Sequence, residues 1–379
     1  MNPRLARACV ATALALAPVA CGTSSSPSAP ADGGPGSATN ATPDAGSPTD
    51  AASPLVPSDG GAPEATDAAG ALSDAGYGAS ATLGFASSTF TLYASIAGGP
   101  AHLVQLDTGS LGLYVPASVL GSSATVSTTT CSITYVSSGT TLSGHEATAP
   151  VALLGATSAG DVTPPPTTVP MTFCAVDDTT FTGGMMGVGF GRGTGSDPSR
   201  NVLLEMAPIK AGTMHAGFVL STHPSPAVQI GLTSGGVAGF QTVALEADPS
   251  GNGDWVATSL RGCLRLPNVV AFATECGGLL VDTGVADCLL WGPTDPTLGG
   301  TVPSGQTLVP NGVALQIEAE AGAPTLDYSF VVGSDAGSPA GVSIRTASAF
   351  SINTGRALLT EFDYLFDAQQ GLVGFRAAP

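Results

Sequence analysis

Basic residues are scarce in this chain. Its 379 residues include 10 lysines and arginines against 28 aspartates and glutamates, which gives a formal net charge of −18. A surface this acidic repels phosphate backbones and gains nothing from anionic lipid headgroups. We therefore expect no nucleic acid partner, and contact with a membrane only through a covalent anchor.

Charged and aromatic residues are also few, at 10% and 6%, whereas the chain has 51 glycines and 30 prolines. This composition favours short strands and turns over amphipathic helices. We therefore expect an all-β fold. Because 379 residues exceed what one hydrophobic core usually holds, we expect this fold to have two lobes. The four histidines show no metal-ligand spacing, and no nucleotide-binding loop or nucleophile elbow is present, so we expect neither metal nor cofactor.

The apolar run near the N-terminus is too short to span a bilayer. Residues 8–17 follow two arginines, which is the pattern of an export signal, and residues 1–21 are expected to form a signal peptide. The run ends at Cys21 in a segment that resembles a bacterial lipobox, although Pro18 stands where leucine is usual. We expect a protein of the bacterial cell envelope, lipid-anchored through Cys21 or, alternatively, secreted.

Residues 22–79 lack lysine, arginine and nearly all large apolar side chains. Serine, proline, alanine and glycine dominate, and such a segment cannot bury enough surface to offset the entropy of ordering it. We predict a flexible linker between the N-terminus and the folded part of the chain.

The triplet Asp-Thr-Gly occurs at residues 107–109 and again at 282–284, each time between an apolar strand and an apolar run that closes on proline. A carboxylate at the end of an apolar strand is poorly solvated, and two in related contexts can meet across a pseudo-twofold axis. Paired carboxyl groups of this kind are typical of hydrolytic active sites. The alternative is that Asp107 and Asp282 are ordinary turn aspartates at strand ends.

Hairpin patterns surround the first triplet. Residues 90–96 and 101–106 flank a Gly-Gly-Pro turn, and residues 132–135 and 147–154 are expected to form a second, projecting hairpin. Residues 201–206 form the segment that best fits a short helix.

Four neighbourhoods within residues 85–379 resemble the pepsin-type aspartic endopeptidases. They are the Gly-x-Pro hairpin at 96–100, the Leu-Tyr-Val-Pro run at 113–116, the strand at 132–135 and the segment 355–375, which is similar to the terminal helix and last strand of the family. The resemblance implies a bilobal double β-barrel, with lobes at residues 80–233 and 234–379 and a cleft between them. It also implies that Asp107 and Asp282 form a catalytic pair that shares one proton and activates a water molecule.

The resemblance assigns supporting roles to the neighbours of the pair. Thr108 and Thr283 are expected to brace the two loops against each other, and the Ser110 hydroxyl is expected to bind the first aspartate. Gly109 and Gly284 are expected to allow close approach of the backbone to the carboxylates.

Two further positions bear on the site. Tyr135 matches the tyrosine of the hairpin, or flap, that covers the cleft in this family. Val285 stands where the family has threonine or serine, so Asp282 lacks the hydroxyl that Ser110 offers to Asp107. Because losing a hydrogen bond to the charged form raises the pKa of a carboxyl group, we expect an upward shift of the pH optimum.

Beyond Cys9 and Cys21, five cysteines remain, and an odd number leaves one thiol unpaired. We expect a Cys131–Cys174 disulfide at the base of the flap. In the second lobe Cys263–Cys276 is favoured, which leaves Cys288 free, while pairing of Cys288 with either of those two stays open.

The leading interpretation is a monomeric aspartic endopeptidase that cleaves polypeptides. The alternative is an envelope protein with the same fold that binds polypeptides but has weak or no catalytic activity.

Overall fold

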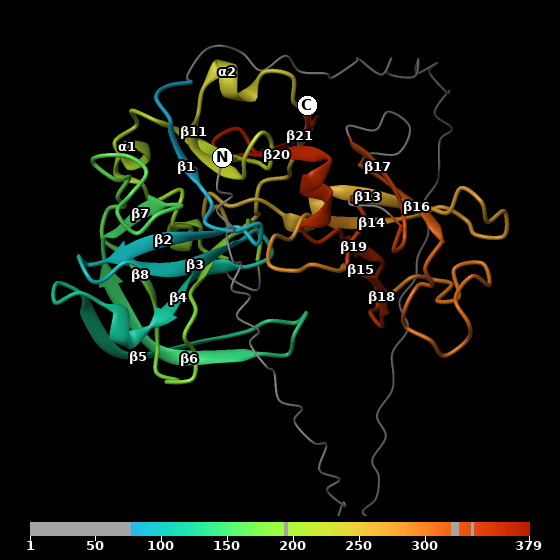
Figure 1. Ribbon diagram of the computed structural model, residues 1–379, viewed down its shortest axis with the longest axis horizontal. Coiled ribbons are helices and arrows are strands. Elements are labelled where there is room, and N and C mark those ends of the chain that lie inside the picture. Colours follow the sequence, from blue (N-terminus) through green and yellow to red (C-terminus); the bar gives the residue numbers. More distant parts are fainter. Residues whose placement is uncertain (1–76, 193–195, 320–325, 335–336) are drawn as a thin grey trace, which may run out of the picture. The chain divides into compact units, whose positions relative to one another are not determined.

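The structure is a computed structural model, and it describes residues 77–379 except 193–195, 320–325 and 335–336. The expected signal peptide, Cys21 and most of the expected linker lie outside these residues. Within the described part, the strands form sheets of eight, seven and six strands, and the helices are short (Figure 1). The expectation of an all-β fold is confirmed.

The eight-stranded sheet comes from the first half of the chain, in the order β5-β6-β8-β4-β9-β3-β2-β7. Side chains alternate between core and surface along its strands; in β2, Leu92, Ala94 and Ile96 are buried. The strands are β2 (Thr91–Ile96), β3 (His102–Asp107), β4 (Leu111–Pro116), β5 (Thr125–Thr134), β6 (Thr141–Ala149), β7 (Val151–Gly155), β8 (Met171–Val176) and β9 (Met185–Val188).

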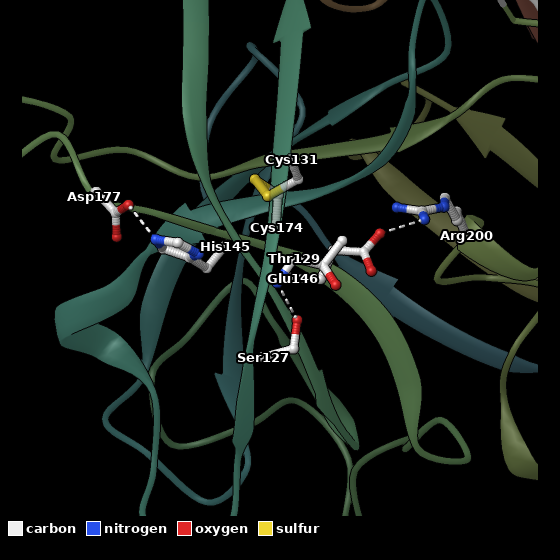
Figure 2. The surroundings of a disulfide bond; sticks show 8 residues. All are labelled: Ser127, Thr129, Cys131, His145, Glu146, Cys174, Asp177 and Arg200. Carbon is white, nitrogen blue, oxygen red and sulfur yellow. Dashed lines mark hydrogen bonds and ion pairs between the residues drawn. A yellow bond between two sulfur atoms is a disulfide. The ribbon is translucent and has the colours of Figure 1, made fainter.

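Strands β5 and β6 form the projecting hairpin, and a disulfide between Cys131 and Cys174 joins β5 to β8 (Figure 2). The expected second arm at residues 147–154 is wrong: β6 ends at residue 149, and β7 pairs with β2 instead. Pro150 separates the two strands, and its missing N–H cannot continue the ladder of β6.

The seven-stranded sheet comes from the second half, in the order β17-β16-β13-β14-β19-β15-β18. The second expected disulfide, Cys263–Cys276, joins directly paired residues of β13 and β14, and Cys288 is free and buried. The strands are β13 (Arg261–Arg265), β14 (Glu275–Leu280), β15 (Cys288–Trp291), β16 (Ala314–Ala319), β17 (Leu326–Val331), β18 (Val342–Arg345) and β19 (Ser351–Asn353).

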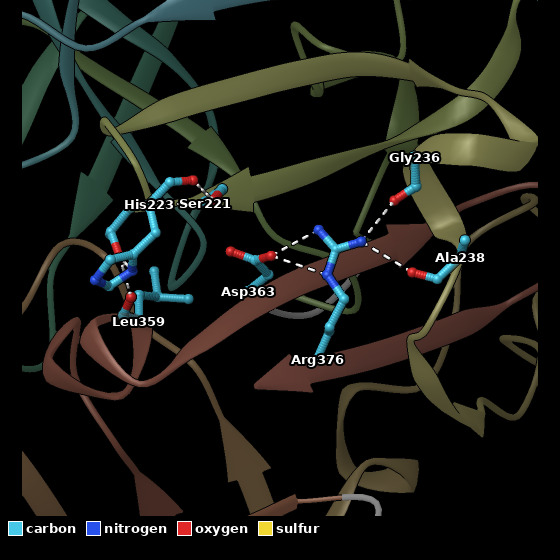
Figure 3. Close-up of polar contacts among 8 residues, drawn as sticks. Ser221, His223, Gly236, Ala238, Leu359, Asp363 and Arg376 are labelled. Atoms are coloured by element: carbon cyan, nitrogen blue, oxygen red, sulfur yellow. Dashed lines mark hydrogen bonds and ion pairs between the residues drawn. The ribbon is translucent and has the colours of Figure 1, made fainter. Parts of the chain in front are cut away.

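The six-stranded sheet, β1-β11-β10-β20-β21-β12, combines strands from both halves. Arg376 on β21 joins this sheet to the α2 segment (Ser234–Val237): its guanidinium donates two hydrogen bonds to Asp363 on β20 and others to the carbonyls of Gly236 and Ala238 (Figure 3). The strands are β1 (Ala81–Gly84), β10 (His215–Ser221), β11 (Ala227–Leu232), β12 (Gln241–Ala244), β20 (Phe362–Asp367) and β21 (Leu372–Ala377).

The first two sheets repeat one local topology around the Asp-Thr-Gly loops. In the first half, β9 pairs parallel to β3 and antiparallel to β4. In the second half, β19 pairs parallel to β14 and antiparallel to β15. Each loop therefore connects two strands that flank a third, and the parallel registers place Met185 opposite Gln105 and Asn353 opposite Leu280.

The helices cover one turn each. They are α1 (Ala207–Lys210), α2 (Ser234–Val237) and the 3₁₀ turns Ala117–Val119, Pro198–Arg200, Ala257–Ser259 and Ala357–Thr360. The predicted helix at residues 201–206 is wrong. The Asn201 side chain instead accepts from the Leu203 N–H and donates to the Val188 carbonyl, so it stabilises a turn that competes with helical bonding.

Candidate active site

The two Asp-Thr-Gly loops bind each other through their threonines. The Thr108 hydroxyl donates to the Val281 carbonyl at 2.6 Å, and the Thr283 hydroxyl donates to the Leu106 carbonyl at 2.7 Å. Each hydroxyl also accepts from the backbone N–H of the other threonine, at 3.0 and 3.1 Å. Both threonines are buried. Because every bond has its counterpart, the exchange fixes the two loops in one relative geometry.

Asp107 and Asp282 meet beside this exchange. Their side chains are nearly buried, with 3% and 6% of each residue exposed, and the two carboxyl groups are within hydrogen-bond reach of each other. The glycines permit this approach: a Cβ atom at Gly109 would overlap the Asp282 carboxylate, and one at Gly284 would lie 2.7 Å from Oδ1 of Asp107. The residues predicted from the two triplets thus lie in one site.

Asp107 is held by its own loop. The Gly109 N–H donates to Oδ1 at 2.8 Å, and the Ser110 hydroxyl donates to Oδ2 at 2.5 Å. The outer oxygen of Asp107 therefore has the hydroxyl donor that the sequence predicts for it.

Asp282 receives its outer donor from a different element. The Gly284 N–H donates to Oδ1 at 2.9 Å, but Oδ2 accepts from Nδ2 of Asn353 on β19, at 2.7 Å. Val285 contributes no hydroxyl, as expected, yet the inference that this leaves a hydrogen bond missing is wrong. Sequence reasoning missed Asn353 because it lies 71 positions from Asp282 and reaches it only through the pairing of β19 with β14.

The pKa of Asp282 is raised to about 7, first by burial and then by the charge of the neighbouring Asp107 carboxylate. The hydrogen bonds from Asn353 and the Gly284 N–H act in the opposite direction. The raised pKa thus results from a dry site and a second acid, and not from the absent hydroxyl at Val285. A pair of this kind holds one proton between two carboxyl groups over a wide pH range.

A cleft of about 930 Å³ contains both aspartates. Tyr114, Phe181 and Met185 line it from the first half of the chain, and Leu289 and Trp291 line it from the second half. Its walls are therefore largely apolar around a polar centre, which suits an extended chain with apolar side chains.

Tyr135 follows β5 directly and also lines the cleft. Its hydroxyl is buried near Ser110 and Asp107 without a well-formed hydrogen bond. Burial, and then the charge of Asp107, raises the pKa of Tyr135 far above its ordinary value, so the hydroxyl stays protonated and able to donate.

No protein-family model and no curated protein sequence matches the chain. Among solved structures, the crystal structure of the aspartic proteinase from Irpex lacteus is similar, with a TM-score of 0.52 over 79% of this chain and 98% of that chain. The sequences are 14% identical. The chain has the bilobal pepsin-like fold. At this identity the likeness shows the fold alone.

One cleft residue has no counterpart in the sequence predictions. Arg192 lines the pepsin-like cleft, its guanidinium lies 5.7 Å from the centre of the Phe190 ring, and its buried Nε has no hydrogen-bond partner among the described residues. Burial lowers the pKa of Arg192, whereas Tyr364 and the two aspartates favour its charged form. An arginine keeps its charge, so a cation lies close to the carboxyl pair.

The described residues contain no group of three or more histidine, cysteine, aspartate or glutamate side chains placed to hold a metal ion. None of their helices has the length and apolarity needed to cross a membrane.

Proposed function

We propose that this protein is an aspartic endopeptidase that hydrolyses peptide bonds through Asp107 and Asp282. The observation that carries the proposal is the pair of buried carboxyl groups within hydrogen-bond reach, held by two equivalent loops at the centre of one apolar cleft. Ordinary turn aspartates cap strand ends at the surface and do not meet in pairs.

The mechanism follows from the shared proton. At mildly acidic pH one carboxyl group of the pair is ionised and the other is protonated. The ionised group removes a proton from a water molecule, which attacks the carbonyl carbon of the peptide bond. The protonated group meanwhile donates toward the carbonyl oxygen. Water attacks directly, so no acyl-enzyme forms. The C–N bond of the tetrahedral intermediate then breaks, the proton taken from the water passes to the departing amine nitrogen, and the carboxyl group that donated to the carbonyl oxygen regains its proton as the C=O bond re-forms.

The cleft supports a polypeptide substrate in extended form. Its apolar walls favour apolar side chains on both sides of the cleaved bond. The Tyr135 hydroxyl, which is buried in the cleft without a hydrogen-bond partner among the described residues, supports a role for Tyr135 as a donor to bound substrate. No nucleic acid or cofactor takes part in the proposed reaction.

We also propose that the protein acts outside the cytoplasm, as a monomer. Two disulfides support an oxidising compartment. The lipobox-like segment supports attachment to the envelope through Cys21, with residues 22–79 as the tether.

The test is cleavage of an unfolded protein by the purified chain between pH 3 and 8, with and without the inhibitor pepstatin. We expect pepstatin-sensitive cleavage that falls by at least about 10³-fold in D107N and in D282N. Cleavage that survives both substitutions would refute the mechanism. Binding of pepstatin without any cleavage would favour the alternative, a binding protein with the same fold.

A further inference from the structure

The outer oxygen of Asp282 has a donor that the triplet motif does not encode. We propose that Asn353 is a positioning residue that takes, at Asp282, the place that Ser110 has at Asp107. This inference rests on the proposed function, because it concerns the orientation and ionisation of the same carboxyl pair.

The hydrogen bonds fix the orientation of the Asn353 amide. Its Oδ1 accepts from the Gly355 N–H at 2.9 Å, so its Nδ2 is the atom that faces Asp282, at 2.7 Å. Asn353 is 6% exposed and lies on β19, between β14 and β15. The amide is therefore a preset donor that cannot turn its oxygen toward the carboxylate without breaking the bond to Gly355.

The donor to the outer aspartate oxygen occupies a different position in each half of the chain. Ser110 is the third residue after Asp107, and Val285 is the third residue after Asp282. In the parallel strand pairs, Met185 lies opposite the residue two positions before Asp107, and Asn353 lies opposite the residue two positions before Asp282. The first half thus has a hydroxyl donor in the loop and an apolar side chain on the strand. The second half has an apolar side chain in the loop and an amide donor on the strand.

The different position of the donor in the second half has a physical consequence for Asp282. A valine leaves the outer oxygen of a nearly buried carboxylate without a donor, which is costly in a dry site. The Asn353 N–H restores the bond and favours the ionised form, which opposes the effects of burial and of Asp107. Arg192 is a further charged group that interacts electrostatically with Asp282.

The experiment compares four variants with the wild type: N353L, N353D, V285T and the double variant N353L/V285T. The main measurement is the titration of the Asp282 carboxyl carbon by ¹³C NMR, with the signal assigned by its loss in D282N. The second is the pH dependence of kcat/KM. N353D keeps an oxygen acceptor for the Gly355 N–H, so it remains informative if N353L does not fold.

We expect the Asp282 midpoint and the alkaline limb of kcat/KM to move up by about one pH unit in N353L. The shift should be at least as large in N353D, because an oxygen replaces the donor. V285T alone should change little, since the donor is already present. In the double variant the new hydroxyl, at the position equivalent to Ser110, should return the midpoint to its wild-type value.

Two results would overturn the proposal. One is an unchanged Asp282 midpoint in both N353L and N353D. The other is a shifted midpoint in N353L that V285T does not reverse, which would assign Asn353 a merely structural role. If the wild type cleaves no substrate, the proposed function fails, but the NMR titration still decides the role of Asn353.

Discussion

The two Asp-Thr-Gly loops are equivalent where they meet and different where they face away from each other. Both use a glycine N–H to bind the inner oxygen of the aspartate, and both use threonine to bind the opposite loop. At the outer oxygens, Ser110 serves Asp107 and Asn353 serves Asp282. The inner contacts repeat, whereas the outer donors come from different elements.

This difference teaches which part of the site tolerates change. The threonine contacts are reciprocal, so a change in one loop displaces the other. The glycine contacts depend on a backbone N–H and on the absence of a Cβ atom, and a side chain from a distant segment cannot supply either. An outer oxygen needs only a donor at hydrogen-bond distance, and a neighbouring strand can supply it. The following predictions test this division, and the largest effects are expected at the inner contacts.

The largest expected effect is a loss of activity when either loop glycine gains a side chain. In G109A the new Cβ overlaps the Asp282 carboxylate, and in G284A it crowds Oδ1 of Asp107. A displacement of the reacting groups by about 1 Å costs on the order of 100-fold in rate, and we expect at least that loss in kcat/KM for both variants. G235A, on α2 with open space around it, is the matched control and should retain full activity.

Each half of the chain contains one disulfide, and the two disulfides are expected to stabilise the fold by different amounts. Cys131–Cys174 closes a sequence separation of 43 residues, and Cys263–Cys276 closes one of 13. From the chain entropy of the unfolded state, we expect the serine double variants to lose about 4 and about 3 kcal/mol of unfolding free energy, respectively. Urea denaturation measures both. The reverse order would show that local packing outweighs loop length.

The parts of the site that the sequence predicted are those encoded within a few residues. Asp107 and Asp282 were recognisable because the same triplet recurs in the same apolar context, and the resemblance to the pepsin-type family assigned the bracing role to the threonines within the triplets. The disulfides followed from residues expected on neighbouring strands of one half. In each case a short segment carries enough information to indicate its own role.

The parts that failed depend on contacts between distant segments. Asn353 becomes a donor only because β19 pairs parallel to β14, and Arg192 reaches the cleft from a loop without any recognisable motif. The predicted helix at residues 201–206 failed for a related reason: the Asn201 side chain donates to the carbonyl of Val188, which lies on β9. Period and composition do not reveal such partners.

The threonine exchange predicts equal costs on the two sides. T108V and T283V each leave a buried carbonyl and a buried N–H without their partner. We expect a loss of about 2 kcal/mol of unfolding free energy for each, and less than the sum for the double variant, because both variants break the same exchange. T129V, at an exposed position on β5, is the control. Clearly unequal costs would show that the loops are not equivalent at their inner contacts.

The pH dependence of activity sharpens the comparison between the two aspartates. Because the pKa of Asp282 is raised to about 7, the pair keeps its proton up to that pH. Above it both groups ionise and the proton donor is lost, so kcat/KM should fall about tenfold per pH unit. The charge of Asp107 contributes to the raised pKa of Asp282 in addition to burial. In D107N, which removes that charge, the Asp282 midpoint observed by ¹³C NMR should therefore fall. If it stays near 7, burial alone raises the pKa, and the two carboxyl groups are not coupled as a pair that shares one proton.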